Sequence, residues 1–236
     1  MYLTVDKGNT RMKWALFEGD RLVRTSEEGE GLPTTHAERA IVCATGALDL
    51  EALRLEADRV TVLTSRTRLP IGLDYGTPET LGPDRIAAAC GAHRLCQGRG
   101  CVIVDAGTCI TVDYLDGVGV YRGGAILPGF EMKFRALHTF TAKLPLLTTV
   151  DAAQEPVTGW STQESMEAGV LTATRYAVEG FVAHYRKHAP DTRVLLTGGD
   201  ADWLWGEGRL RVSDCVWEPY LVMIGLNEIL KENEKY

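Results

Sequence analysis

The sequence predicts an α/β fold made of two similar halves, each built on a mixed β-sheet. One stretch occurs twice: an apolar strand ends in an acid and a glycine follows two positions later, at Asp6 and Gly8 and again at Asp105 and Gly107. Each copy opens a run of short β-prone segments joined by tight turns. After the first run, a strand–helix–strand pattern requires a crossover connection. Two such halves describe a duplicated ribonuclease-H-like architecture, with a nucleotide expected in the cleft between them.

Composition indicates an ordinary globular protein. The chain has 236 residues, of which 45% are hydrophobic and 24% charged, enough for one large domain or two small ones. A net charge of -7 argues against general binding of nucleic acid or anionic membranes, but it does not exclude ATP. No apolar run approaches the roughly 20 residues of a membrane span, and the first residues lack the apolar core of a signal peptide. We therefore expect a cytoplasmic protein.

The cysteines and histidines favour no metal centre. None of the six cysteines forms a C-x-x-C pair, so we interpret them as reduced, mostly buried thiols, which again favours the cytoplasm. His184 and His188 are four residues apart and could share a helix face. Without a third ligand or an interposed acid, a partly exposed surface pair is favoured over a zinc site.

The first half is predicted to be mainly strands. Apolar and alternating residues indicate strands over residues 2–6, 12–17, 21–25, 40–44 and 59–64. Residues 49–57 have helical spacing, with Leu50, Leu53 and Ala57 on one face.

A loop and a helix complete this half. Residues 67–83 contain three prolines and three glycines, which predicts a loop that crosses the surface. A helix is expected over residues 86–97, begun by Pro83 or Asp84, because proline and an acid both suit the first helical turn.

The second half repeats the pattern. Strands are predicted over residues 101–104, 112–115, 118–122, 193–197 and 212–216. Helices are predicted over residues 130–141, 161–188 and 220–235, the second broken near Gly169 or Gly180, and residues 148–156 are expected to form an irregular loop. The predicted domain boundary divides residues 1–98 from residues 99–236.

The first turn has the chemistry of a phosphate site. Gly8 allows the backbone to approach a phosphate closely, Asn9 and Thr10 add side-chain donors, and Lys13 returns with a positive charge. Asp6 could hold Mg²⁺ directly or through water. The alternative is a plain hairpin turn with a half-buried acid. Recurrence of the turn in the second half favours function, because two phosphate turns facing one cleft are hard to explain structurally.

A third glycine turn closes another strand at Thr197-Gly198-Gly199-Asp200. Paired glycines there would let a base or sugar lie against the backbone. A tight strand-to-helix turn explains the same residues equally well.

The sequence also contains a candidate acceptor site at Gly82-Pro83-Asp84-Arg85. A hydroxyl that accepts a phosphoryl group needs a base to take or orient its proton, and Asp84 is such a carboxylate. Arg85 could bind an anionic substrate through its fork of donors. Taken alone, the pair is more typical of an N-capping acid beside a surface arginine than of a substrate site.

These motifs together resemble one family. The order D-x-G-N-T, Y-x(6)-G-x-D-R, V-D-A-G-T-x-x-T-x-D, G-G-x-I-x-P-G and T-G-G-D-A resembles type III pantothenate kinase, a family of the actin-like ATPase superfamily. The resemblance implies ATP-dependent phosphorylation of pantothenate to 4'-phosphopantothenate, the first step of coenzyme A biosynthesis. It also implies a homodimer that uses Mg²⁺ and a monovalent cation, K⁺ or NH₄⁺.

Site residues follow from the resemblance by motif. The implied ATP-binding residues are Asp6, Lys7, Gly8, Asn9, Thr10, Arg11, Met12, Lys13 and Thr108. The implied pantothenate-binding residues are Tyr75, Gly82, Pro83, Asp84, Arg85 and Thr162, with Asp84 also the proton acceptor. Asp105 is the implied ligand of the monovalent cation.

Two departures from the family pattern are visible. Lys7 stands where an apolar residue is usual, and its partner could be an acid or a phosphate. The chain is also short, mainly in the loops of the first half. Neither departure removes an implied catalytic group.

Three other functions compete with this one. A sugar kinase of the same superfamily is disfavoured by Arg85 beside Asp84 and by the lack of a polar sugar-binding run. A catalytically idle nucleotide-binding regulator is disfavoured by the intact Asp84 and Asp105. An interaction protein stabilised by dimerisation alone would not need two phosphate turns.

Overall fold

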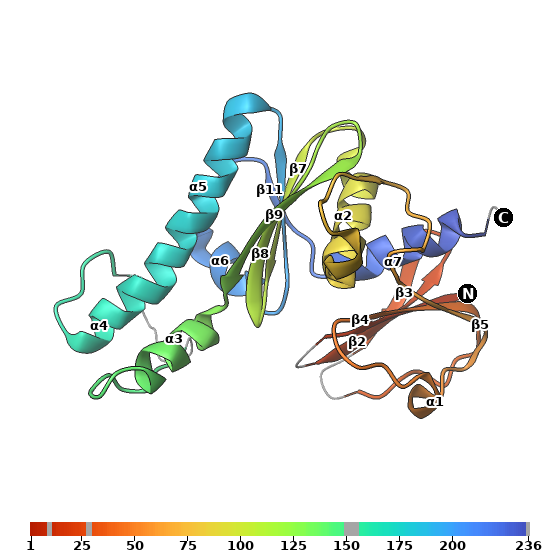
Figure 1. The fold of residues 1–236 in the computed structure, drawn as a ribbon, viewed down its shortest axis with the longest axis horizontal. Coiled ribbons are helices and arrows are strands. Elements are labelled where there is room, and N and C mark those ends of the chain that lie inside the picture. Colours follow the sequence, from red (N-terminus) through yellow and green to blue (C-terminus); the bar gives the residue numbers. More distant parts are fainter. Residues whose placement is uncertain (9–10, 27–29, 149–155, 235–236) are drawn as a thin grey trace. The chain divides into compact units, whose positions relative to one another are not determined.

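The computed structural model describes residues 1–8, 11–26, 30–148 and 156–234 (Figure 1). The predicted phosphate-turn residues Asn9 and Thr10 therefore lie outside the described residues, as does most of the loop predicted over residues 148–156. Within the described ranges, no helix has the length and apolar character to cross a membrane.

The first sheet confirms the predicted meander and crossover. Its strands are β1 (Tyr2–Lys7), β2 (Met12–Glu18), β3 (Arg21–Thr25), β4 (Ala37–Ala44) and β5 (Ala57–Val62), in the order β3-β2-β1-β4-β5. β1 pairs antiparallel with β2, and β2 with β3, whereas β4 runs parallel to both β1 and β5.

The two faces of this sheet have different roles. Leu3, Val5, Trp14 and Leu16 belong to the buried cluster on one face. Since successive side chains alternate between faces, Thr4 and Asp6 point to the other. There α7 (Leu221–Glu232) packs on β1, and the Thr4 hydroxyl lies 3.3 Å from the Met223 sulfur.

The helix predicted over residues 49–57 is wrong in its length. α1 spans only Leu50–Leu53, and Arg54 adopts the left-handed conformation with φ of 48°. Ala57 already pairs with Ala37 as the first residue of β5. Strand pairing therefore overrides the local helical spacing.

The loop predicted over residues 67–83 contains two short regular pieces. β6 (Gly72–Leu73) pairs parallel with β9 (Val120–Pro128), and a 3₁₀ turn, η1, spans Pro78–Thr80. α2 then runs over Pro83–Cys96 with Gly82 as its N-cap, which confirms the predicted helix start at Pro83.

The second sheet is built around β7 (Cys101–Ala106). With β8 (Cys109–Leu115), β10 (Arg193–Thr197) and β11 (Cys215–Trp217), the sheet order is β11-β10-β7-β8-β9-β6. The prediction of a strand over residues 118–122 was too short, because β9 continues through the glycine-rich stretch to Pro128. A Cβ atom at Gly124 would lie 2.2 Å from the Val112 carbonyl oxygen, so the glycine permits close strand pairing and does not end the strand.

The helices after β9 largely match prediction. They are α3 (Phe130–Thr139), α4 (Thr162–Glu167), the π-helical η3 (Ala168–Thr172), α5 (Ala173–His188), α6 (Ala201–Trp205) and the 3₁₀ turn η4 (Gly206–Gly208). The irregularity predicted near Gly169 is the π turn, whereas Gly180 lies inside an unbroken α5. The short helix α6 was not predicted.

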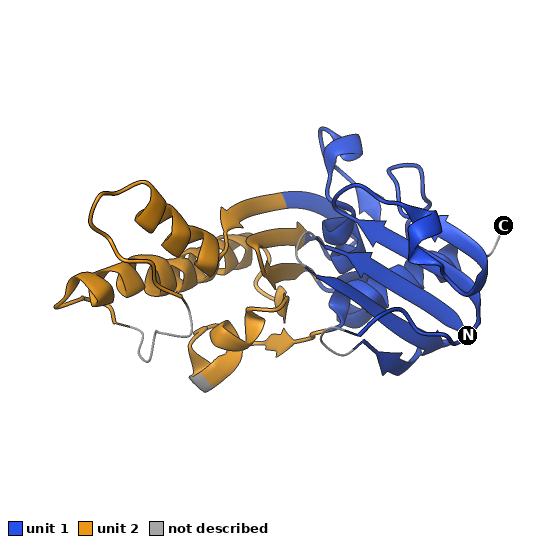
Figure 2. Cartoon of the chain, turned by 90° about the horizontal axis from the view of Figure 1, so that it is seen from below, with its two compact units in different colours: residues 1–99, 115–123, 220–236 blue, residues 100–114, 124–219 orange. Residues whose placement is uncertain are grey.

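The chain divides into two compact units that are discontinuous in sequence (Figure 2). Unit 1 comprises residues 1–99, 115–123 and 220–236, and unit 2 comprises residues 100–114 and 124–219. The sequence predicted a single division between residues 98 and 99. α7 groups with the first unit because it packs on α2, where a Cβ atom at Gly225 would lie 1.7 Å from the Ala87 carbonyl oxygen.

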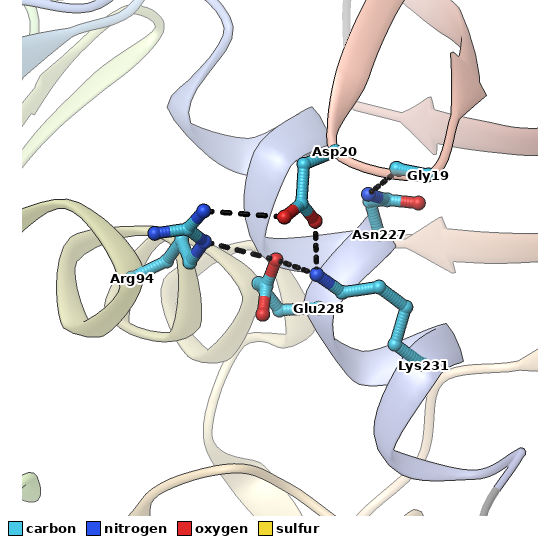
Figure 3. Close-up of polar contacts among 6 residues, drawn as sticks. All are labelled: Gly19, Asp20, Arg94, Asn227, Glu228 and Lys231. Carbon is cyan, nitrogen blue, oxygen red and sulfur yellow. Dashed lines mark hydrogen bonds and ion pairs between the residues drawn. The ribbon is translucent and has the colours of Figure 1, made fainter.

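A polar cluster connects the β2–β3 turn of unit 1 to α2 and α7 (Figure 3). Asp20 accepts hydrogen bonds from Arg94, at 3.2 Å, and from Lys231. The Asn227 side-chain amide donates to the Gly19 carbonyl at 2.9 Å. The hairpin tip is therefore fixed to both helices that cover the sheet.

Candidate active site

Asp6, on β1 of unit 1, is the first candidate for binding a cation. Adjacent strands place it opposite Lys13 of β2 and Cys43 of β4. Its Oδ1 atom is buried and has no hydrogen-bond partner among the described residues. Burial and the nearby Asp84 charge raise the pKa of Asp6 to about 6, against the opposing effects of Lys13 and a hydrogen bond from the Cys43 thiol. A carboxylate in this state has one oxygen available for a cation or a proton.

The other residues of the first turn divide between the two sheet faces. Lys7 pairs with Met12 in the strand register, so their side chains share the face opposite to Asp6 and Lys13. The Lys7 ammonium donates to the Ala47 carbonyl at 2.9 Å, which is neither of the partners that the sequence left open. A Cβ atom at Gly8 would lie 3.2 Å from a backbone oxygen of the exposed Arg11, a tight contact that favours glycine.

The start of α2 carries the candidate base. The Asp84 Oδ1 atom accepts a hydrogen bond from the Arg85 backbone N–H at 2.9 Å. A Cβ atom at Gly82 would lie 2.5 Å from the same oxygen, so only glycine at the N-cap leaves this carboxylate its position. Because the Asp84 charge raises the pKa of Asp6, the two acids act on one another electrostatically.

Two predicted substrate residues, Arg85 and Tyr75, both lie near Tyr121, a residue that sequence reasoning missed. The Arg85 guanidinium carbon lies 6.0 Å from the ring centre of Tyr121, and the Tyr75 ring centre also lies 6.0 Å from it. Arg85 is only 7% exposed and Tyr121 is fully buried. The available signal for Tyr121 was its place directly before the R-G-G-A-I stretch of β9, which was interpreted only as part of a strand.

In unit 2, three motifs meet around the second turn. Thr197 pairs with Asp105, and Gly198 turns back with φ of +98°. A Cβ atom at Gly198 would lie 2.4 Å from the Asp105 Oδ1 atom. The Asp200 backbone N–H donates to the Ala106 carbonyl at 2.8 Å. The T-G-G-D turn is therefore packed directly on the D-A-G turn.

The glycine before α3 completes this arrangement. Gly129, its N-cap, donates its N–H to the Thr108 carbonyl at 3.1 Å. A Cβ atom there would lie 2.2 Å from the Gly107 carbonyl oxygen. Thr108 itself is exposed, as a residue that contacts a ligand must be.

Comparisons with known proteins identify the family. Residues 39–184 match the family model for type III pantothenate kinase. A type III pantothenate kinase from Cytophaga hutchinsonii is 40% identical over 246 residues, which cover 99% of this chain and all of that protein. Another from Phocaeicola vulgatus is 34% identical over the full length of both chains. The chain belongs to the type III pantothenate kinase family.

A solved structure shows the fold independently. The activator of 2-hydroxyisocaproyl-CoA dehydratase from Clostridium difficile, with bound ADPNP, matches all of this chain and 97% of that one at a TM-score of 0.54 and 12% identity. This likeness and the two mixed sheets with their helices show the duplicated ribonuclease-H-like fold.

The last residue implied by resemblance to type III pantothenate kinase, Thr162, lies in unit 2. It is the exposed first residue of α4, after the N-cap Ser161, whose hydroxyl accepts from the Glu164 N–H at 3.2 Å. An open cavity of about 730 Å³ beside it is lined in part by Leu137 and Trp160. Tyr75, Asp84 and Arg85, the other side chains implied for the substrate of this type III pantothenate kinase family member, belong to unit 1.

The acids suit Mg²⁺ that is bound together with a nucleotide. The described residues contain no group of three or more His, Cys, Asp or Glu side chains able to hold a metal ion. Mg²⁺ usually needs only one or two carboxylates, with water and phosphate oxygens as its other ligands. The Oδ1 atom of Asp6, buried and without a hydrogen-bond partner in the part of the chain that the structure describes, and the neighbouring Asp84 fit that requirement.

Proposed function

We propose that this chain transfers the γ-phosphoryl group of ATP to pantothenate, giving 4'-phosphopantothenate in the first step of coenzyme A biosynthesis. Membership of the type III pantothenate kinase family supports this, because the family model matches residues 39–184 and a relative of that name matches 99% of the chain. The observation that carries the proposal is local: Asp84 and Arg85 are consecutive at the start of α2, Tyr121 lies beside that arginine, and Tyr75 lies beside Tyr121.

These residues divide the work on the acceptor. Asp84 accepts or orients the proton of the pantothenate hydroxyl as that oxygen attacks phosphorus. Arg85 binds the pantothenate carboxylate through its guanidinium, and burial strengthens that charge-assisted bond. Tyr75, Gly82 and Pro83 shape the site, and Thr162 adds a hydroxyl.

The two glycine turns act on ATP. Backbone N–H groups of residues 6–13 and the side chains of Asn9, Thr10 and Lys13, together with Thr108, bind its phosphates and stabilise charge that develops during in-line transfer. Mg²⁺, held by Asp6 directly or through water, would neutralise phosphate charge when bound. Lys13, opposite Asp6 in the strand register, adds positive charge on the same face.

A coupled ADP-release assay tests the proposal. Purified protein is given ATP and Mg²⁺ with pantothenate, glucose, acetate or no acceptor, each with and without K⁺. ADP release that occurs only when pantothenate is the acceptor supports the proposal. Turnover with glucose identifies a sugar kinase, and tight nucleotide binding without turnover identifies a regulator.

We further propose that Asp105 binds a monovalent cation, K⁺ or NH₄⁺. The second turn supports this, since the Asp105 carboxylate and the Ala106 carbonyl are packed together there by Gly198. Activity should rise when K⁺ or NH₄⁺ replaces Na⁺, and Asp105→Asn should remove that difference. An equal response of wild type and variant would contradict the assignment.

We also propose that the enzyme is a cytoplasmic homodimer. Unit 2 exposes large apolar side chains around α3 and α4: Phe140 is 85% exposed and Trp160 93%, and such surfaces favour association. The four buried free cysteines fit a reducing compartment. Light scattering should give twice the mass of one chain, and Trp160→Ser should lower it; a monomeric wild type would refute the dimer.

A further inference from the structure

An arginine outside the implied site connects two acids in unit 1. The Arg122 Nε atom donates to the Asp116 Oδ2 atom at 2.8 Å, and its Nη1 atom donates to the Asp74 Oδ2 atom at 2.7 Å. Asp116 is itself fixed, because its Oδ1 atom accepts from the backbone N–H groups of Val118 and Val120 at 3.1 and 2.8 Å. Arg122 therefore extends from a rigid turn to Asp74.

Asp74 lies in the segment that carries the substrate tyrosine. Besides the β6–β9 pairing, the Gly72 N–H donates to the carbonyl of Gly119, just before β9, at 2.9 Å, and the Asp74 N–H donates to the Tyr121 carbonyl of β9 at 3.0 Å. The regular pairing of β6 with β9 covers two residues, Gly72 and Leu73. Arg122 adds a charged side-chain contact at its end.

The next residue, Tyr75, has its ring against β9. A Cβ atom at Gly123, where φ is +90°, would lie 3.5 Å from the Tyr75 Cδ2 atom, so the bare glycine backbone faces the ring. The Tyr75 ring also contacts Tyr121, and the two ring centres are 6.0 Å apart. A change in Asp74 would thus be passed on to the ring through one peptide unit.

We propose that Arg122 is a positioning residue for the acceptor site: by joining Asp74 to Asp116, it holds Tyr75 where pantothenate binds. The proposal rests on the proposed function for its ligand, and on the described contacts for its mechanism. Arg122 acts through the 72–75 segment and touches neither ATP nor pantothenate.

The expected effect is selective for one substrate. Arg122→Gln keeps much of the side-chain length but loses the charge and the fork of donors. Because exposed ion pairs contribute little, we expect KM for pantothenate to rise about threefold to fivefold. Both kcat and KM for ATP should stay within about twofold of wild type, and Arg122→Lys should be intermediate, since one ammonium cannot make both contacts as the fork does.

The chain offers a matched control in Arg94. Its side chain is 42% exposed, against 43% for Arg122, and it too joins two acids, Asp20 and Glu228. Arg94→Gln should leave KM for pantothenate unchanged. Asp74→Asn should raise KM in wild type but add nothing in Arg122→Gln, because both changes remove the same contact.

Three results would overturn the proposal. These are an unchanged KM for pantothenate in Arg122→Gln, an equal rise in Arg94→Gln, or additive effects of the Asp74 and Arg122 changes. Asp74 is a surface acid, 69% exposed, so Asp74→Asn tests the contact even where Arg122→Gln folds poorly.

Hydrogen exchange separates this proposal from the proposed function. The Gly72 and Asp74 amides should exchange faster in Arg122→Gln than in wild type, whether or not the protein accepts pantothenate. Wild type without pantothenate turnover would refute the function alone. Unchanged exchange at both amides would refute the positioning role of Arg122 alone.

Discussion

The Asp6→Asn variant should be more stable than the wild-type protein and inactive. Folding raises the pKa of Asp6 from 3.8 to about 6, chiefly through burial and then through the Asp84 charge. The folded state therefore holds the Asp6 proton more tightly than the unfolded chain does. Stability from this group is fully present below about pH 3.8 and is lost as the pH rises through about 6.

The magnitude follows from the size of this shift. A shift from 3.8 to about 6 corresponds to about 3 kcal/mol of unfolding free energy at pH 7.5, an upper figure because Asp6 keeps some contact with solvent. Asparagine has a similar shape but no charge. We therefore expect Asp6→Asn to gain about 1–3 kcal/mol at pH 7.5 and almost nothing at pH 4.

Urea unfolding at both pH values, without nucleotide or Mg²⁺, measures this gain. Asp20→Asn is a control of opposite sign, because Lys231 and Arg94 lower the pKa of Asp20. Its effect should be a small loss at pH 7.5, since the Asp20 side chain is 57% exposed. Destabilisation by Asp6→Asn at pH 7.5, or an equal gain at both pH values, would refute the reasoning.

Three further changes test the acceptor site and the packing of unit 1. Asp84→Asn should lower kcat at least about 100-fold with ATP affinity nearly unchanged; unaltered turnover in a steady-state assay would remove Asp84 as the base. Arg85→Ala should mainly raise KM for pantothenate, and equal activity on pantothenol, which lacks the carboxylate, would contradict the proposed carboxylate contact. Gly225→Ala should cost about 3 kcal/mol, because its Cβ atom would lie 1.7 Å from the Ala87 carbonyl oxygen. Gly180→Ala, where a Cβ atom meets open space inside α5, should instead raise the melting temperature by the gain in helix propensity.

Local sequence predicted the strands well because their signals are local. Alternating apolar residues and the turn at Gly19 specify the β1–β2–β3 meander without help from distant residues. Around Leu50 the local signal failed. The spacing there fits a helix, but Ala57 gains a pairing partner in β4, and a short helix has little stability of its own to compete with that pairing.

The structural roles of several glycines were the hardest features to predict from the sequence. The strand predicted over residues 118–122 stopped before Gly123 and Gly124, yet both lie inside β9, where one faces the Tyr75 ring and the other the backbone of β8. Gly225 likewise permits close contact with Ala87 of α2, a residue 138 positions earlier in the sequence. No local sequence pattern reveals that contact. Such contacts explain why the sequence did not predict that α7 groups with unit 1.

The site residues show the same division between local and long-range information. Motifs identified Asp6 and Asp84, but the electrostatic interaction between them depends on α2 covering the face of the sheet to which Asp6 points. That interaction gives the acids opposing effects: mutual repulsion and burial cost stability, while the same acids provide the negative charge that a nucleotide-bound cation needs. If this is correct, Mg²⁺ with a non-hydrolysable ATP analogue should stabilise wild type more than Asp6→Asn, and the variant's advantage at pH 7.5 should shrink or reverse as the ligand is added.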